Sequence, residues 1–388
     1  QCIDDNKGVY IPRDNKELPK RLAQKGYNKA VVKKGEARLK QIGKILQDYT
    51  DDEIEKYDID VLEYLHADKM EPVNGNIKIL PPIVDITRQD MFSKIYNKLM
   101  NSALIKLFPG LIRKMHLRKT YDVEISFNYL IPTFLLSKNS QKRIAWMHGS
   151  IYDLEENKRL KNKQRKALSS VNKIVAISNA TEKSIASVFP EFKDKIIKIY
   201  NGYDFSGMVP EGTVTDFQLL YCNRFDENKD PLQFIRIVKR LNDLGLSVTA
   251  KMLGTGVLFN EAVRLIREYK LEAQIECVGY KKNPYAYYKH CKVFCLTSHS
   301  EGFPTTLVEA MYFGKPFVST PVAGTDELSN NGLCGFIEDN EDAYIDRIVQ
   351  LLKDQNLYKM MSGNCRNHAL DYSLDKQIRT IEKYIDEE

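Results

Sequence analysis

The stretch His299–Thr320, HSEGFPTTLVEAMYFGKPFVST, decides how this chain is interpreted. It follows the apolar run VFCLT (293–297), which predicts a buried strand. Pro304 is typical of the first turn of a helix, so residues 298–304 are expected to form a loop at the carboxyl end of that strand. The free N–H groups at the start of such a helix favour an anion, and phosphate in particular.

Two carboxylates stand on either side of this expected helix start. Glu301 precedes the Gly-Phe-Pro turn, and Glu309 lies four residues after Thr305, on the helix face that would turn toward the same space. Carboxylates bind sugar and ribose hydroxyls strongly, while backbone N–H groups hold a diphosphate. The stretch therefore suits a sugar nucleotide, and the alternative is an incidental strand, loop and helix with surface glutamates.

Strand-like and helix-like segments alternate on both sides of this stretch, from about residue 171 onward. FQLLYCN (217–223) predicts a strand, and the next segment predicts a helix that opens on Asp230-Pro231 and closes on Gly245. Such alternation indicates a parallel sheet covered on both faces, with ligands at the carboxyl ends of its strands. Residues 206–340 are thus expected to form one doubly wound domain.

The first half of the chain is less regular. Residues 1–35 fit no element, and residues 1–80 contain neither a glycine pair nor a strong apolar first strand. We expect a helix at 36–49, a strand at 142–150, a strand leading into a helix at 120–136, and a capped helix at 373–388.

Size and composition favour a two-domain globular protein. The chain has 388 residues, 43% of them apolar and 28% charged, which argues against disorder. It has no run of about 18 uncharged apolar residues, so we expect no membrane span, and its first residues do not resemble a signal peptide. Its seven cysteines form no CxxC pair, which indicates reduced thiols in a cytoplasmic protein and no cysteine-based metal site.

Positive charge is concentrated in one segment. Arg88 to Lys166 contain seventeen Lys and Arg against six Asp and Glu, a balance of +11 in a chain of net charge +6. This pattern indicates either an anionic partner or a solvated basic helix face. Within it, SALIKLFPGLIRKMHLRK (102–119) suits docking to an anionic membrane face, although apolar residues at helical spacing also suit a core. Nucleic acid is not expected as a partner, because the segment lacks interleaved aromatic and basic motifs.

The motifs resemble those of a known family. EGFPTTLVEAM (301–311) resembles the E-x7-E signature of glycosyltransferase family 4, the retaining enzymes of the two-domain GT-B fold. Four further stretches are similar to family segments: IYNGYD (199–204), YCNRFDENKDPLQFI (221–235), the run from Cys277 to Pro304, and PVAGTDELSNNGLCGFI (321–337). Two features depart from the family. Residues 1–80 contain nothing like the glycine-rich first loop, so the first unit has either diverged beyond recognition or been replaced, and Asn223 stands where glycine is usual. NIKILPP (76–82) resembles the family's later strand.

The resemblance implies an α/β fold of two Rossmann-like, doubly wound domains that face a central cleft, with an atypical N-terminal unit. Residues 1–204 would bind the acceptor, residues 205–372 would bind the donor, and the helix at 373–388 would pack back on the first domain. The chain would be a retaining, metal-independent glycosyltransferase without a cofactor. It would move a hexose or N-acetylhexosamine, most simply from UDP, to a hydroxyl of a glycan or lipid-linked acceptor in polysaccharide biosynthesis.

The resemblance also implies roles for individual residues. Arg224 and Lys229 would neutralise the diphosphate, His148 would face the donor sugar, and Glu301 would hold its hydroxyls. Glu309 would bind the ribose. The remaining donor-binding positions would be Gly279, Tyr280, Gly302, Phe303, Pro304, Thr305, Thr306 and Leu307. Ser178 and Asn179, in a similar loop, are weaker candidates.

Two other interpretations bear on function. The GTG at 254–256 lacks the third glycine and the acidic residue of a dinucleotide fingerprint, so it predicts only a turn.

A catalytically decayed binding protein of the same fold is the alternative function. The expected location is the cytoplasm, with peripheral contact at the inner face of the plasma membrane if the basic segment docks there.

Overall fold

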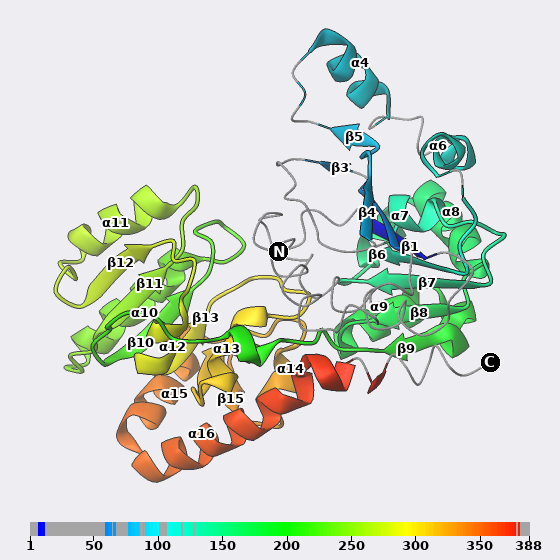
Figure 1. Cartoon of the computed structure of the whole chain (residues 1–388). Helices are drawn as coiled ribbons and strands as arrows, with labels where there is room; N and C mark the ends of the chain where they lie inside the picture. Colours follow the sequence, from blue (N-terminus) through cyan, green and yellow to red (C-terminus); the bar gives the residue numbers. More distant parts are fainter. Residues whose placement is uncertain are drawn as a thin grey trace. The chain divides into compact units, whose positions relative to one another are not determined.

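The computed structural model describes residues 7–11, 59–63, 65–66, 77–85, 88, 90–100, 107–117, 119–127, 129–377 and 379–380. The chain divides into two units, traced in sequence colours in Figure 1. Unit 1 comprises Gln1–Gly202 with Leu374–Glu388, and unit 2 comprises Tyr203–Ser373. The boundaries predicted from the sequence, after residues 204 and 372, lie close to these positions.

Unit 2 is built around a six-stranded, entirely parallel sheet with the strand order β12-β11-β10-β13-β14-β15. The strands are β10 (Phe217–Cys222), β11 (Ala250–Leu253), β12 (Ile275–Gly279), β13 (Cys291–Leu296), β14 (Phe317–Ser319) and β15 (Gly335–Ile337). The helical elements are η4 (Phe205–Gly207), α10 (Pro231–Asp243), α11 (Phe259–Glu268), α12 (Tyr285–His290), α13 (Thr305–Tyr312), α14 (Thr325–Ser329), α15 (Glu341–Lys353), α16 (Gln355–Ala369) and η5 (Leu370–Tyr372). The doubly wound domain is confirmed, and it extends beyond residue 340 by α15 and α16.

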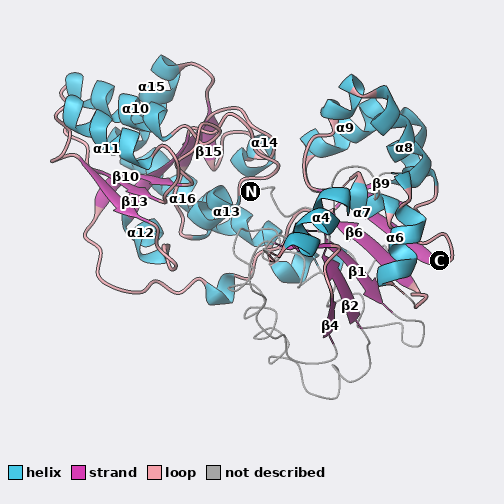
Figure 2. Ribbon diagram, turned by 90° about the horizontal axis from the view of Figure 1, so that it is seen from above, coloured by secondary structure: helices cyan, strands magenta, loops and turns pink. Residues whose placement is uncertain are grey.

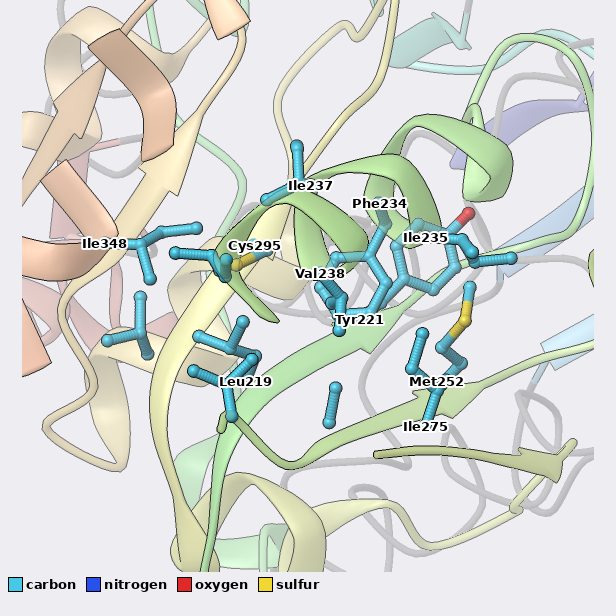
Figure 3. Packing of buried hydrophobic residues seen from close by; sticks show 14 of the residues in the cluster. Leu219, Tyr221, Phe234, Ile235, Ile237, Val238, Met252, Ile275, Cys295 and Ile348 are labelled. Atoms are coloured by element: carbon cyan, nitrogen blue, oxygen red, sulfur yellow. The ribbon is translucent and has the colours of Figure 1, made fainter. Parts of the chain in front are cut away.

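The core of unit 2 lies between this sheet and its helices. Leu219 and Tyr221 of β10 are fully buried against Phe234 and Val238 of α10, and Figure 3 shows these side chains packed together. Because α10 places an apolar residue on one face every three or four positions, it buries that stripe on the sheet. Burying each such side chain contributes about 1.5–3 kcal/mol, so this core fixes the ends of β10 and β13 firmly.

Unit 1 contains a seven-stranded sheet with the order β4-β2-β1-β6-β7-β8-β9 and a separate parallel pair, β3 with β5. The strands are β1 (Lys7–Ile11), β2 (Ile59–Glu63), β3 (Leu65–His66), β4 (Ile77–Leu80), β5 (Val84–Asp85), β6 (Val123–Phe127), β7 (Lys142–Met147), β8 (Lys173–Ala176) and β9 (Ile196–Lys198). The helical elements are α4 (Met91–Leu99), α6 (Pro109–His116), α7 (Ile131–Phe134), η2 (Tyr152–Glu156), α8 (Lys158–Ser169), α9 (Asn179–Val188) and η3 (Pro190–Lys195). Figure 2 shows helices α6 to α9 beside this sheet.

Residues 1–80, in which no strong apolar first strand was predicted, do supply a strand beside β6. Residues 7–11 form β1, which lies between β2 and β6 and runs antiparallel to both, whereas the other neighbours in the large sheet are parallel. The atypical character of the N-terminal unit therefore lies in the direction of this strand. The helix expected at 36–49 lies outside the described residues.

The end of the chain returns to unit 1. Residues 374–377 and 379–380 are helical, and the Gly202 N–H donates to the Gln377 carboxamide oxygen. Across the part of the chain that the structure describes, no helix combines the length and apolarity needed to cross a membrane.

Candidate functional site

The strand order of unit 2 fixes where a ligand would bind. Counted along the chain from β10, the order is 3-2-1-4-5-6, that of dinucleotide-binding doubly wound folds. Connections leave β10 and β13 in opposite directions, so a crevice is expected where the carboxyl ends of these two strands meet. Arg224 and Lys229 follow β10, and Glu301 follows β13, so the fold brings predicted site residues together at this switch point.

The loop after β10 is held by hydrogen bonds from buried hydroxyls. The Tyr221 hydroxyl donates to Arg224 O at 2.8 Å and lies 3.2 Å from Lys229 O. Thr297, at the end of β13, lies 3.1 Å from Lys229 O and 2.9 Å from Asp230 O through its own hydroxyl. Asp230 has a positive φ of 38° and caps α10 by accepting from Gln233 N at 2.9 Å. The loop is thereby anchored on both strands and on the helix that it starts.

The two switch-point loops are also bonded to one another. His299 N donates to Asn228 O at 2.8 Å, and Asn228 Nδ2 donates to Ser300 O at 3.0 Å. Because one bond joins the two backbones and the other ties the Asn228 side chain to the Ser300 carbonyl, the two loops hold fixed relative positions.

Lys229 and Glu301 form a buried ion pair. Lys229 Nζ lies 2.5 Å from Glu301 Oε1, with side-chain exposures of 4% and 8%. Burying two charges is costly unless each faces the other and is hydrogen bonded. The predicted diphosphate cation and the predicted sugar-binding carboxylate are thus direct partners, and a ligand's phosphate and hydroxyl oxygens would bind at a site already organised by this pair.

Arg224 stands beside this pair in sequence but has its own partner. Its Nη2 lies 3.0 Å from Asp226 Oδ2. Within the described part of the chain its Nε atom is buried without a hydrogen-bond partner, and the same holds for Asn223 Nδ2 and Ser298 Oγ. All three belong to residues that closely follow β10 or β13, and unsatisfied buried polar atoms are rare in native proteins. They are donors suited to a ligand rich in oxygen, and Asn223 and Ser298 are absent from the candidates predicted from the sequence.

The GTG segment (254–256) packs against the backbone of the loop that contains Arg224. The turn predicted at 254–256 lies at 257–258 and follows a loop over 254–256, in which Gly254 and Gly256 have φ values of 131° and 158°. A Cβ at Gly254 would lie 1.8 Å from Asn223 O, and one at Gly256 would lie 2.3 Å from Phe225 O. Phe225 N donates to Thr255 O at 3.0 Å. The glycines therefore allow the two backbones to approach closely, a role that their sequence spacing alone does not show.

Among the described residues, the start of α13 has no side-chain cap on its first N–H groups, and its N-cap residue is Pro304. Leu307 was expected to offer a free N–H, but this group donates to Pro304 O at 3.2 Å and the Leu307 side chain is fully buried. Thr305 and Thr306 are half-buried, and Gly302 before the turn is half-buried as well.

Phe303 and Pro304 point into the protein. Both are buried, and the Phe303 ring lies 5.4 Å from that of Tyr372. A Cβ at Gly324 would lie 2.7 Å from the Phe303 ring, so α14 begins directly against this turn. These side chains shape the loop, and only their backbone remains as a donor-binding candidate.

Glu309 lies on α13 in a desolvated environment. Burial raises its pKa to about 7, and the nearby Tyr288 hydroxyl partly opposes this shift. Burial also raises the pKa of Tyr203, and the charges of Glu309 and Glu301 add to that effect. Among the residues that the structure describes, the buried Tyr203 hydroxyl has no hydrogen-bond partner. It therefore lies within electrostatic range of both predicted carboxylates, and no local sequence signal identified it.

Gly279 and Tyr280 end β12, two strands from the switch point. Gly279 has a φ of 78°, a Cβ added to it would meet no described atom within 4 Å, and its carbonyl accepts from Gly254 N at 3.0 Å. Tyr280 is 54% exposed. Gly279 and Tyr280 lie at the carboxyl edge of the sheet, as expected, and their placement beside the base of a nucleotide stays a prediction.

His148 belongs to unit 1, directly after β7. It is almost completely buried, and burial lowers its pKa to about 3. The imidazole is therefore neutral near pH 7. Of the weaker candidates, Ser178 caps α9 by accepting from Thr181 N at 3.1 Å, and Asn179 accepts from Lys198 Nζ. Those bonds give both residues structural roles.

The described residues contain no group of three or more His, Cys, Asp or Glu side chains that could hold a metal ion.

Comparisons with known proteins agree with this architecture. Residues 210–368 match the family model described as glycosyl transferases group 1. The chain is 29% identical over 195 residues to the N-acetylgalactosamine-N,N'-diacetylbacillosaminyl-diphospho-undecaprenol 4-alpha-N-acetylgalactosaminyltransferase of Campylobacter jejuni, covering 48% of this chain and 52% of that one. The chain thus spans about half the length of this curated relative.

A second relative is matched over a longer stretch. The UDP-Gal:alpha-D-GlcNAc-diphosphoundecaprenol alpha-1,3-galactosyltransferase of Escherichia coli is 24% identical over 315 residues, covering 74% of this chain and 81% of that one. Among solved structures, Anabaena Alr3699/HepE in complex with UDP and glucose has a TM-score of 0.64 at 16% identity, covering 81% of this chain and 87% of that one. The GT-B fold class is thereby confirmed, and assignment to family 4 stays a prediction. In its motifs, its strand order and the match of residues 210–368, the chain is similar to the glycosyl transferases group 1.

Proposed function

We propose that this chain is a retaining, metal-independent glycosyltransferase that moves a sugar from a nucleoside diphosphate, UDP in the first instance, to a hydroxyl of a glycan or lipid-linked acceptor. The observation that carries the proposal is the switch point of unit 2, where Arg224, the Lys229–Glu301 pair and the uncapped start of α13 meet the same sheet edge. Cations and N–H groups fixed before the reaction stabilise a leaving diphosphate without reorganisation.

The roles follow from the chemistry of each group. Arg224 and the ammonium of Lys229 would balance the charge that develops on the departing diphosphate, and the Thr305 and Thr306 N–H groups would bind its oxygens. Glu301 would accept from hydroxyls of the transferred sugar, and Glu309 from those of the ribose. His148, neutral at physiological pH, would orient the sugar or polarise a hydroxyl.

The retaining course and the lack of a metal requirement rest on the resemblance. In a front-side reaction the departing phosphate takes the proton of the attacking hydroxyl, so no carboxylate is needed as a base. Relatives named for diphospho-undecaprenol substrates favour a lipid-linked glycan as acceptor. A cytoplasmic location, at the inner face of a membrane that carries such lipids, is part of the proposal.

UDP release tests the proposal. The protein is incubated with UDP-glucose, UDP-galactose and their N-acetylated forms, with and without a diphospho-undecaprenol glycan, in the presence and absence of EDTA. We expect UDP release that depends on acceptor, persists in EDTA and falls at least about a hundredfold in Glu301→Ala. Glu276→Ala, which removes an exposed carboxylate on β12, serves as the control. The linkage formed should keep the anomeric configuration of the donor.

Binding of UDP-sugar without release of UDP and without transfer of the sugar to any acceptor would instead identify a catalytically decayed binding protein. An inverted product would contradict the retaining course, and loss of activity in EDTA would contradict metal independence.

A further inference from the structure

Helix α4 (Met91–Leu99) presents its apolar face to solvent. Phe92 is 80% exposed and Met91 is 68% exposed. At 100° per residue, the apolar residues of this helix fall within an arc of about 140°, and all of them are exposed: Met91, Phe92, Ile95, Tyr96 and Leu99. A surface helix ordinarily buries such a face and exposes its polar side, so α4 has the reverse orientation.

The opposite face holds α4 in this orientation. Asn97 Nδ2 donates to Asp85 O at 2.6 Å, and Asp85 N donates to Asn97 Oδ1 at 3.1 Å, which ties the helix to β5. Met100, one residue after the helix, is buried in the cluster that contains Ile83, Val84 and Ile112. The outward direction of the apolar arc is therefore set by specific contacts of the inward face.

Helix α6 (Pro109–His116) lies beside α4 and also exposes apolar side chains. Leu111 and Met115 are exposed, as are Leu107 and Phe108 just before the helix, while Ile112 is buried. The Tyr96 hydroxyl lies 3.3 Å from His116 Nε2 and so joins α4 to α6. Figures 1 and 2 both show the two helices as neighbours within unit 1.

Two exposed lysines lie along this surface. Lys94 borders the apolar arc of α4, and Lys114 lies next to Leu111 and Met115 on the exposed side of α6. Asp90 caps α4 by accepting from Ser93 N at 2.9 Å, and hydrogen bonds from the Ser93 side chain and backbone lower its pKa, so this carboxylate stays anionic. Arg113, in contrast, turns inward to Glu124 at 2.6 Å.

We propose that the exposed apolar residues of α4 and of residues 107–115, with Lys94 and Lys114, form a docking surface for an anionic lipid bilayer. Contiguous exposed apolar patches on soluble proteins mark interaction sites. Apolar side chains flanked by lysines match the boundary between acyl chains and anionic headgroups. The sequence prediction placed such a contact on 102–119. The structure adds α4 to it and assigns Ile112 and Leu117 to the core.

Co-sedimentation with vesicles tests this surface without donor or acceptor, so its outcome is independent of the glycosyl transfer proposed above. Wild type is mixed with vesicles of phosphatidylcholine alone or with added phosphatidylglycerol. We expect binding to the anionic vesicles that weakens with salt. The variant Phe92→Ser with Leu111→Ser should lower the partition coefficient about tenfold for each side chain. Lys94→Gln with Lys114→Gln should lower it about fivefold for each charge.

Val257→Ser is the matched control, because Val257 is 84% exposed but lies in unit 2. It should bind as wild type does. The proposal is overturned if the Phe92 and Leu111 substitutions leave vesicle binding unchanged, or if both kinds of vesicle bind equally. It is also overturned if sedimentation velocity shows a dimer that these substitutions dissociate, because a second copy of the chain would then cover the surface.

Discussion

Lys229 Nζ lies 2.5 Å from Glu301 Oε1, in a pair whose side chains are almost wholly buried and whose residues stand 72 positions apart in the chain. The pair joins the loop after β10 to the loop after β13 at the switch point of the unit 2 sheet. Under the proposed function, these opposite charges would face the phosphates and the hydroxyls of a sugar nucleotide.

Breaking this pair should cost stability. Glu301→Gln leaves the buried ammonium of Lys229 without its anion, and we expect a loss of about 3–5 kcal/mol in the free energy of unfolding. Lys229→Met with Glu301→Leu removes both charges and should recover most of that loss while remaining inactive. Asp243→Asn, at the exposed Lys239–Asp243 pair, should change stability by less than about 0.5 kcal/mol. Urea denaturation measures all three, and equal effects at the two sites would contradict the structural role of the buried pair.

Gly254→Ala should displace the Arg224 loop. The added Cβ would collide with the Asn223 carbonyl, and the residue would keep a φ of 131°, so we expect a destabilisation on the order of 3 kcal/mol together with weaker UDP binding. Gly245→Ala is the matched control, because its φ is 79° but its Cβ would meet no described atom within 4 Å. It should cost about 1 kcal/mol and leave UDP affinity unchanged. Unaltered UDP affinity in Gly254→Ala would show that this loop does not position Arg224.

Glu309 should make unit 2 less stable as the pH rises. Its folded-state pKa is raised to about 7 from an ordinary value of 4.5, so between these values the folded protein retains a proton that the unfolded chain has lost. Stability should therefore decrease by about 1.4 kcal/mol per pH unit across this window. Glu309→Gln should remove that slope. Chemical denaturation at pH 5, 6 and 7, followed by circular dichroism, compares the two, and identical slopes would refute the assigned environment of Glu309.

His148 should make unit 1 less stable as the pH falls. Its folded-state pKa is lowered to about 3, so as pH falls below the ordinary value of 6.5 the unfolded chain gains a proton that the folded protein does not bind. Stability should fall by about 1.4 kcal/mol per pH unit toward pH 4, and less steeply in His148→Gln. The single tryptophan of the chain, Trp146, is buried two residues away in β7, so its fluorescence reports on this unit. A steeper acid slope in the variant would be inconsistent with a buried neutral imidazole.

Much of unit 2 was predictable because its signals are local. Each strand from β10 to β14 is an apolar run bounded by turn residues, and Asp230-Pro231 and Gly245 mark the ends of α10. The helices after residue 340 also carry local signals, since Asn340 and Asp354 cap α15 and α16, although no helix was predicted there.

What escaped prediction depends on contacts between distant residues. Strand β1 has only five residues, and its place in the sheet comes from antiparallel pairing with β2 and β6, far away in sequence. The pairing of Lys229 with Glu301, the support of Asn223 by Gly254 and the closeness of Tyr203 to both glutamates arise in the same way. Sequence patterns placed the site residues at the ends of strands, but only the assembled sheet determines which of them meet.

Calorimetric titration of UDP and UMP into wild type and Arg224→Ala tests the central claim most directly. The claim is that the switch point of unit 2 binds a nucleoside diphosphate through its cations. We predict that wild type binds UDP more tightly than UMP, and that Arg224→Ala lowers UDP affinity about tenfold or more while changing UMP affinity much less. Arg264→Ala, at an exposed arginine of α11, should bind both as wild type does. Equal loss of affinity for UDP and UMP, or no loss in Arg224→Ala, would contradict the account.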